Sequence, residues 1–266
     1  MFCGTLVLSG YEDGLICCWD IETGNFNFPM IGHSNRVNHM LASEQHQYIY
    51  SSANDCTVRR WDVQTGVCEN IYKFADPISV IKMKEDWNFM FTASWDKMVR
   101  VIDLDKQLTV KSFVASKETI KEMLVVGDGG ADSMIIVAGC EPIIRAYNFE
   151  TGAQKMFQGH RGWVYCLLLF EGKLFSGGDD NVIRVWDLKT CLQLEELVAH
   201  RNGVTSIVLV NNMLVSASFD HYIVAWDFPA MLLRIEEKKL MRLADIESRK
   251  IEVFNRLMDE KNSRKN

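Results

Sequence analysis

The stretch SGGDDNVIRVWDLKT, from Ser176 to Thr190, decides the fold because it is not unique in the chain. Related segments are SGYEDGLICCWDIET from Ser9, SSANDCTVRRWDVQT from Ser51, TASWDKMVRVIDLDK from Thr92 and SASFDHYIVAWDFPA from Ser216, with a weaker copy, VAGCEPIIRAYNFET, from Val137. The closing residues are Asp20, Asp62, Asp103, Asn148, Asp187 and Asp227, so successive units are 42, 41, 45, 39 and 40 residues apart. A period of about 40 to 45 residues that ends in Trp-Asp predicts a repeated unit of four antiparallel strands.

Each unit contains three short apolar runs separated by polar turns, as between Gly159 and Asp187. The run 164–170 is apolar almost throughout and predicts a strand covered on both faces, whereas the alternation around Ile183 and Val185 predicts a half-exposed strand. After Trp-Asp, turns such as IETG, VQTG and FETG supply a glycine for a positive φ and predict a fourth strand. One such sheet cannot bury both faces alone, so the sheets are expected to stack around an axis.

The bulk composition indicates a globular chain. With 266 residues and 48% apolar side chains, the repeats favour a single all-β ring. No apolar run approaches the roughly 20 residues that cross a bilayer, and the start lacks the pattern of a secretory signal, so we expect an intracellular location, cytoplasmic or nuclear. The eight cysteines show no Cys-x-x-Cys and no zinc spacing. We therefore expect reduced, mostly buried thiols and neither metal nor cofactor.

Charge is unevenly distributed. The net charge is −6, and residues 1–230 carry 19 basic against 28 acidic side chains, whereas residues 231–266 carry 10 against 7. An acidic body is a poor surface for a nucleic-acid backbone, so direct binding of nucleic acid by the ring is not expected.

The repeated residues resemble those of the WD40-repeat β-propeller family, over residues 1 to about 228. In that family a His before the innermost strand, a Ser or Thr in the second strand, an Asp in the next turn and a Trp in the third strand form a hydrogen-bonded set. Three units carry the whole pattern: His33, Ser51, Asp55 and Trp61; His160, Ser176, Asp180 and Trp186; His200, Ser216, Asp220 and Trp226. The resemblance implies an all-β WD40 propeller with six recognisable blade units.

Ser, His and Asp are also the groups of a nucleophilic triad. An enzyme needs one triad, whereas this trio recurs in three units, each time with a strand-ending Trp. The repetition favours a structural role, the satisfaction of buried polar groups between strands, and we expect no catalytic residue. The third unit has Ile102 in place of Trp and no His, and the fourth has Val137, Glu141 and Tyr147. We expect both units to lack the hydrogen-bonded set and to be less stable.

The two ends of the repeat array do not match. The chain begins at what looks like a second strand, TLVLSG, and after Asp227 it continues as FPAMLLRIEEKKLMRL instead of a Thr-Gly turn and an outer strand. We expect an incomplete first unit, a ring that is not properly closed, and an N-terminally truncated form of a longer, multidomain protein. The alternative is that part of MLLRIEE pairs as the outer strand.

Residues 229–266 are expected to form a helical tail after a propeller of residues 1–228. The tail is rich in helix formers, and the predicted helix runs from about Ala230 to Glu260. An interrupted apolar stripe consists of Leu240, Leu243, Ile251, Phe254 and Met258. Docking on the side of the propeller, binding of a partner helix and contact with a membrane surface are the alternatives for this stripe.

The family resemblance implies a rigid binding platform, with contacts on the face where the inner strands begin. The residues expected to contact a peptide or protein partner there are Trp95, Trp163, Tyr165, Phe219, Arg36, Asn38, Glu12 and Asp179. Aromatic and Arg side chains dominate binding hot spots, so the four aromatics are the main candidates.

The favoured function is a noncatalytic protein-interaction scaffold or adaptor, for example a ubiquitin-ligase substrate receptor. An RNA-associated propeller in a ribonucleoprotein complex is the alternative, which the acidic body disfavours. An enzyme is less expected, because the sequence contains no His/Asp/Glu cluster outside the repeats.

Overall fold

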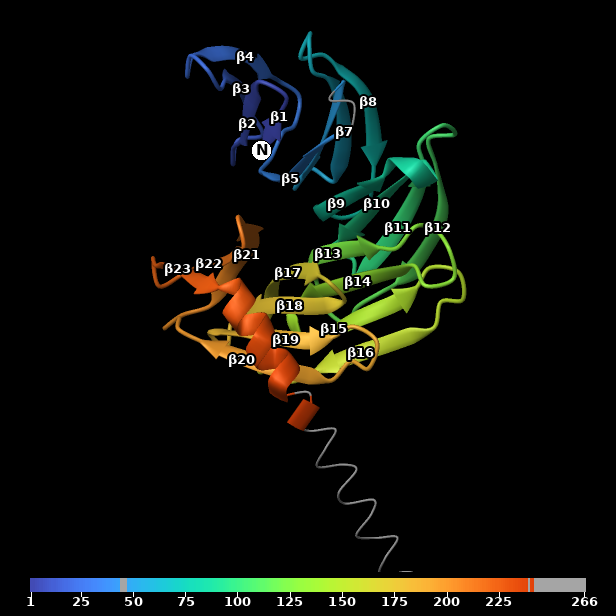
Figure 1. The fold of residues 1–266 in the computed structure, drawn as a ribbon. Helices are drawn as coiled ribbons and strands as arrows, with labels where there is room; N and C mark the ends of the chain where they lie inside the picture. Colours follow the sequence, from blue (N-terminus) through green and yellow to red (C-terminus); the bar gives the residue numbers. More distant parts are fainter. Residues whose placement is uncertain (44–46, 239, 242–266) are drawn as a thin grey trace, which may run out of the picture.

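The computed structural model describes residues 1–43, 47–238 and 240–241, and it shows six antiparallel sheets arranged around a common axis (Figure 1). The first sheet contains β1 (Phe2–Cys3), β2 (Leu6–Gly10), β3 (Ile16–Asp20) and β4 (Phe26–Met30). The second contains β5 (Val37–Ala42), β6 (Tyr48–Ala53), β7 (Thr57–Asp62) and β8 (Cys68–Lys73). The third contains β9 (Ile78–Lys84), β10 (Phe89–Ser94), β11 (Met98–Asp103) and β12 (Leu108–Val114), with the short helix η1 (Glu85–Trp87) between its first two strands.

The remaining three sheets follow the same order. The fourth contains β13 (Ile120–Val126), β14 (Met134–Gly139), β15 (Glu141–Asn148) and β16 (Gln154–Gln158). The fifth contains β17 (Val164–Phe170), β18 (Lys173–Gly178), β19 (Val182–Asp187) and β20 (Gln193–Val198). The sixth contains β21 (Val204–Val210), β22 (Met213–Ser218) and β23 (Ile223–Asp227). Each sheet is a meander, and β5, β9, β13, β17 and β21 contact one another in turn along the inside of the ring. The all-β prediction with six blade units is confirmed.

The turn between the third and fourth strands repeats for a local reason. In the second sheet, Asp62 Oδ1 accepts hydrogen bonds from the Thr65 amide at 2.7 Å and from its hydroxyl at 2.8 Å, and Gly66 follows at φ 68°. The same bonds join Asp187 to Thr190. The Asp side chain thus closes the turn, and the left-handed residue after it directs the chain into the outer strand.

The hydrophobic core lies between neighbouring sheets. Phe175, Ile183 and Val185 of the fifth sheet are buried against Val204 and Leu214 of the sixth. β19 is buried almost along its whole length, so the prediction that this third strand is half exposed is wrong. The reason is that Arg184, the polar residue of the alternation, is itself buried in an ion pair with Asp180.

The first sheet has a partial inner strand. Phe2 and Cys3 pair with Val7 and Leu6, so a two-residue strand occupies the innermost position that the sequence was expected to leave empty. Cys3 is buried in the core between the first two sheets, together with Leu8. Four of the eight cysteines are buried and four are partly exposed.

The sixth sheet has three strands, because the chain leaves β23 as a helix. Residues 228–238 and 240–241 are helical, and Asp227 Oδ1 accepts a hydrogen bond from the Ala230 amide at 3.1 Å at the start of the helix. The alternative that MLLRIEE forms the outer strand is therefore wrong. No helix among the described residues is long and apolar enough to span a membrane.

The first turns of this helix dock on the fifth and sixth sheets. Phe228, Met231 and Ile235 are buried in the core cluster of those sheets. Lys238 Nζ lies 2.6 Å from Glu195 Oε2 on β20, which adds an ion pair at the edge of the contact. Leu240, the first residue of the predicted stripe, is exposed. Leu243, Ile251, Phe254 and Met258 lie outside the described residues.

The ring is not closed, and Figure 1 shows the sixth sheet separated from the first. One face of the sixth sheet is consequently uncovered. Ile223 is 74% exposed, whereas Ile183, which has the same register position in the fifth sheet, is 0% exposed. Val208 and Val210 of β21 are also exposed on this apolar sheet.

The difference between these two isoleucines can be tested directly. We expect Ile183→Lys to unfold the protein or lower its stability severely, because a lysine there would be buried without a partner. Ile223→Lys is expected to change the free energy of unfolding by no more than about 0.5 kcal/mol, as exposed substitutions do. Chemical denaturation of both variants measures this. Equal destabilisation by the two variants would show that something covers the sixth sheet in solution.

Candidate functional site

A buried hydrogen-bonded set ties each complete unit together, as the fifth sheet shows. Trp186 Nε1 of β19 donates to Ser176 Oγ of β18 at 2.8 Å, and His160 Nε2 lies 2.7 Å from the same oxygen. His160 Nδ1 lies 2.9 Å from Asp180 Oδ1, in the turn between β18 and β19. An ionised carboxylate only accepts hydrogen bonds, so the Nδ1–H group of His160 donates to Asp180. The loop before β17 is thereby fixed to both following strands.

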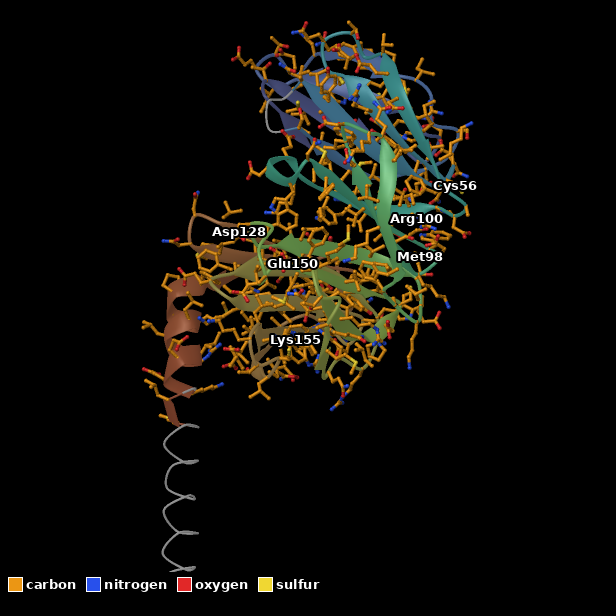
Figure 2. The ribbon with its side chains drawn as sticks, turned by 90° about the vertical axis from the view of Figure 1, so that its right-hand side faces the viewer. Cys56, Met98, Arg100, Asp128, Glu150 and Lys155 are labelled. Atoms are coloured by element: carbon orange, nitrogen blue, oxygen red, sulfur yellow. The ribbon has the colours of Figure 1, made fainter. Side chains whose placement is uncertain are left out.

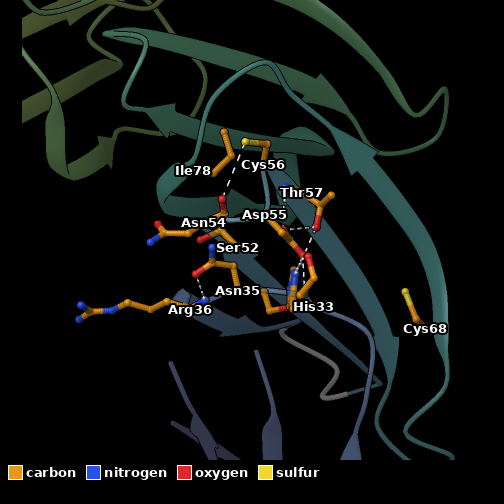
Figure 3. Close-up of polar contacts among 12 residues, drawn as sticks. His33, Asn35, Arg36, Ser52, Asn54, Asp55, Cys56, Thr57, Cys68 and Ile78 are labelled. Carbon is orange, nitrogen blue, oxygen red and sulfur yellow. Dashed lines mark hydrogen bonds and ion pairs between the residues drawn. The ribbon is translucent and has the colours of Figure 1, made fainter. Parts of the chain in front are cut away.

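The same set forms in the second and sixth sheets. The Ser51 hydroxyl oxygen lies 2.7 Å from both His33 Nε2 and Trp61 Nε1, and Figure 3 shows His33 joined to Asp55 and Thr57. In the sixth sheet the three corresponding distances are 2.8 Å for His200 to Ser216, 3.0 Å for Trp226 to Ser216 and 3.0 Å for His200 to Asp220.

In these sets Ser, His and Asp are hydrogen-bonded in the same order as in a catalytic triad, but the serine is not accessible to a substrate. Ser51, Ser176 and Ser216 are each 0% exposed. Each hydroxyl oxygen also accepts a Trp indole proton from the neighbouring strand. The geometry therefore assigns the trios to the support of the fold, because no substrate carbonyl reaches a serine of this kind.

In the set of the second sheet, the pKa values of His33 and Asp55 are both lowered, which favours a neutral His beside an ionised Asp. Burial lowers the pKa of His33 more than the neighbouring Asp55 raises it. Burial alone would raise the pKa of Asp220, but hydrogen bonds from the Arg201 and Tyr222 amides and from His200 outweigh it and lower the pKa to about 2. The Asp therefore stays an acceptor over the physiological pH range.

An arginine that was not predicted from the sequence pairs with the turn acid in the third, fourth and fifth units. It follows the turn acid by four residues in the second to fifth units, as Arg59, Arg100, Arg145 and Arg184. Arg184 Nη1 pairs with Asp180, and Arg100 Nη2 lies 2.6 Å from Asp96 Oδ2. This fixed spacing was visible in the sequence and could have identified the residue.

The fourth unit keeps a hydrogen-bonded set of different composition. Glu141 accepts from Arg145 Nη2 at 2.7 Å, from Ser116 Oγ at 2.5 Å and from the Lys117 amide at 3.1 Å. Ser116 occupies the position of the His. The expectation that this unit lacks a set is therefore wrong, because the longer Glu side chain reaches a serine where Asp reaches a histidine.

The third unit holds only part of the set. Arg100 pairs with Asp96 and lies beside Met98 (Figure 2), but the buried Thr92 hydroxyl has no hydrogen-bond partner among the described residues. Ile102 replaces the Trp whose indole would donate to that hydroxyl.

The top face, defined as the end of the ring at which β5, β9, β13, β17 and β21 begin, repeats one backbone contact. There the residue before the turn acid donates its amide to a carbonyl just before the inner strand. These bonds are Asn54 to Arg36, Trp95 to Pro77, Cys140 to Thr119, Asp179 to Trp163 and Phe219 to Gly203, at 2.8 to 3.0 Å. The side chains of both positions are thus carried on ordered backbone.

Four of the predicted contact residues meet on the fifth and sixth sheets. The rings of Trp163 and Tyr165 lie 6.3 Å apart at 83°, and those of Tyr165 and Phe219 lie 5.7 Å apart at 88°. The Tyr165 hydroxyl donates to Asp179 Oδ1 at 3.2 Å. Trp163 is 48% and Phe219 53% exposed, while Tyr165 is half-buried between them. Burial, followed by the nearby Asp179 carboxylate, raises the pKa of Tyr165.

The other predicted residues form two separate groups. Trp95 is exposed on the third sheet, and Lys121 Nζ lies over its ring at 5.1 Å from the centroid. Arg36 Nη1 lies 3.8 Å from Glu12 Oε1, both largely exposed, and Figure 3 shows the Arg36 side chain pointing away from His33. Asn38 is held in place, since its Nδ2 donates to Asn54 Oδ1 at 2.8 Å and to the Ile78 carbonyl at 2.9 Å.

A cavity of about 700 Å³ lies between the fourth and fifth sheets, away from these residues. Its apolar lining includes Met134 and Leu188, and its polar lining includes Lys155, which lies on the fourth sheet (Figure 2). Lys155 Nζ already donates to the Lys189 carbonyl at 3.4 Å. Within the described part of the chain, no group of three His, Cys, Asp or Glu side chains is placed to hold a metal ion.

Comparison with known proteins identifies the repeat. The sequence model of the WD domain, G-beta repeat, matches residues 24–62, 152–187 and 191–227. An uncharacterised WD repeat-containing protein of Schizosaccharomyces pombe is 24% identical, and the match covers 83% of this chain and 62% of that protein. A CCR4-associated factor 4 homolog of Vanderwaltozyma polyspora is 26% identical over 77% of this chain and 30% of its own length. The chain thus spans less than two thirds of the length of these relatives.

A solved structure agrees on the fold. The crystal structure of the computationally designed protein Ika8 superposes with a TM-score of 0.72, over 86% of this chain and 70% of that one, at 22% sequence identity.

Removal of one serine hydroxyl tests the buried set. Ser176→Ala leaves Trp186 and His160 without their shared partner, and we expect it to lower the free energy of unfolding by about 1–3 kcal/mol. Thr92→Val is the matched control, because the Thr92 hydroxyl has no partner within the described residues and its loss is expected to be neutral or stabilising. Urea denaturation measures both values. A larger loss for Thr92→Val than for Ser176→Ala would contradict the assignment.

The lowered carboxylate pKa values predict sensitivity to acid. Because the pKa of Asp220 falls from 3.8 to about 2 on folding, the unfolded chain binds more protons, and stability is lost as the pH falls from 3.8 to about 2. Asp220→Asn is expected to be less stable than the unsubstituted protein at neutral pH. Because the amide does not titrate, the variant is expected to lose less stability than the unsubstituted protein between pH 3.8 and about 2. Thermal unfolding from pH 7 to pH 2 checks this. Identical losses in the variant and the unsubstituted protein would count against the role of Asp220.

Proposed function

Because the chain belongs to the WD40-repeat family, we propose that it is a noncatalytic protein-interaction scaffold that binds a peptide or protein partner on its top face. The observation that carries this proposal is the continuous group formed by Trp163, Tyr165, Phe219 and Asp179. Two large exposed rings lie on either side of a third that is fixed by a hydrogen bond. Rigid, amphipathic rings of this kind supply contact area at a low entropic cost.

The frame beneath this group supports a binding role. Trp163 follows the loop that His160 fixes, and Phe219 precedes the turn acid Asp220. The buried sets of the fifth and sixth sheets therefore hold the backbone on which the rings are carried. Preorganised side chains lose little freedom when a partner binds, which raises affinity for a given contact area.

The two other groups would extend the contact along the ring. Trp95 lies on the third sheet with Lys121 over its face, and Arg36, Asn38 and Glu12 lie on the first two sheets. A partner bridging the third, fifth and sixth sheets would use Trp95 as a second anchor, with the charged residues setting specificity at its edge. A chain with such a face could act, for example, as the substrate receptor of a ubiquitin ligase.

The test compares the proteins that co-purify with the chain and with the triple variant Trp95→Ala, Trp163→Ala, Phe219→Ala. The matched control truncates three apolar side chains that are exposed on outer strands, Val110→Ala, Val114→Ala and Met156→Ala. Circular dichroism first establishes that all three proteins are folded. We expect the top-face variant to lose a discrete set of partners by at least about tenfold, as the loss of hot-spot side chains does. Equal recovery of that set with both variants would remove the top face as the binding site.

A further inference from the structure

The aromatic–acid cluster, defined as Trp163, Tyr165, Phe219 and Asp179, contains a carboxylate whose charge is not compensated. Tyr165 donates one neutral hydrogen bond to Asp179 Oδ1 at 3.2 Å, and no Lys, Arg or His of the described chain lies within ion-pair distance of Asp179. Two other exposed acids of the top face, Glu12 and Glu118, lie close to a basic side chain. Glu12 lies 3.8 Å from Arg36, and Glu118 lies 3.6 Å from Lys97.

The rings of the cluster likewise have no cation over them among the described residues. Elsewhere in the chain this contact recurs: Lys121 lies over Trp95 at 5.1 Å, and Arg60 lies over Tyr48 at 4.7 Å. A cation over a ring face is attracted by the negative electrostatic potential of that face. Trp163 and Phe219 therefore present ring surfaces of the type that this fold uses for cations, next to an unpaired carboxylate.

The residue at the centre of the cluster is a glycine, Gly203. A Cβ atom added to Gly203 would lie 3.2 Å from Tyr165 Cε2, 3.3 Å from Phe219 Cδ2 and 3.4 Å from the Asp179 Cα. The absence of a side chain lets the two rings and the acid approach one another. The cluster is therefore one compact surface formed by two sheets.

We propose that this cluster binds a cationic side chain of the partner, with arginine as its preferred form. The proposal rests on the proposed function, because it names the chemistry recognised at the same face. A guanidinium group stacks on aromatic rings through its plane and donates to a carboxylate through its edge, and both partners are present here. An apolar side chain would desolvate Asp179 without replacing its lost hydration, and an anionic one would be repelled by it.

No Lys or Arg among the described residues lies over these rings or pairs with Asp179, so we assign the cation to the partner. The body of the protein is acidic, with 28 acidic against 19 basic side chains in residues 1–230, so a basic peptide is also favoured at longer range. Lys121 already lies over the ring of Trp95. No such cation lies over Trp163 or Phe219 in the described part of the chain, so their rings are open to a cation of the partner.

The experiment titrates the full chain with three blocked tripeptides, Gly-Arg-Gly, Gly-Lys-Gly and Gly-citrulline-Gly, and follows the indole N–H resonance of Trp163 by NMR. Citrulline matches arginine in shape but is neutral, so it separates charge from contact area. We expect the arginine peptide to shift the Trp163 resonance and the citrulline peptide to bind at least tenfold more weakly. The lysine peptide is expected to fall between them. Equal binding of the arginine and citrulline peptides would overturn the proposal.

Two variants assign the effect to the cluster. Asp179→Asn is expected to weaken binding of the arginine peptide at least tenfold. Asp76→Asn, at an exposed acid just before β9 at the same end of the ring, is expected to leave that binding unchanged. An unchanged affinity in Asp179→Asn would overturn the proposal. If Trp163→Ala loses protein partners while Asp179→Asn keeps them and the arginine peptide does not bind, the cationic ligand is wrong and the binding face stands. If the triple variant Trp95→Ala, Trp163→Ala, Phe219→Ala loses no partner, the proposed function itself fails.

Discussion

A buried serine hydroxyl that is shared between a Trp indole and a His ring is the interaction on which the complete units depend. It joins the second strand to the third and both to the loop before the first. In the fifth sheet the Ser176 hydroxyl links Trp186, 10 residues after it, to His160, 16 residues before it. Buried polar groups of this kind are costly unless all are satisfied, so the set specifies one arrangement of strands and loop. The position of the top-face side chains follows from it.

Stacking of the sheets is the second constraint, and its consequences differ at the two ends of the array. Within the array each sheet covers the next, so β19 is buried although its sequence alternates. At the last sheet nothing in the described chain covers the equivalent face, and Ile223 is exposed. The helix that follows β23 docks on the fifth and sixth sheets through Phe228, Met231 and Ile235.

The sequence was sufficient to predict the units, the buried sets and the position of the top face, because the repeat brings the same residue types to the same register. It was not sufficient for contacts between units. The pairing of Lys121 with Trp95 and the meeting of Tyr165 with Phe219 each join residues of neighbouring sheets. The replacement of His and Asp by Ser116 and Glu141 also escaped prediction, because a changed pair was taken as a lost one.

We propose that the rings of the fifth and sixth sheets contact the partner. The most direct measurement is photo-cross-linking in cells with benzoylphenylalanine in place of Phe219, compared with the same residue at Val110, which is equally exposed on the outer strand β12. If these rings contact the partner, position 219 gives a discrete cross-linked partner that is reduced by Asp179→Asn and absent from position 110. The same products from both positions, or none from position 219, would contradict it.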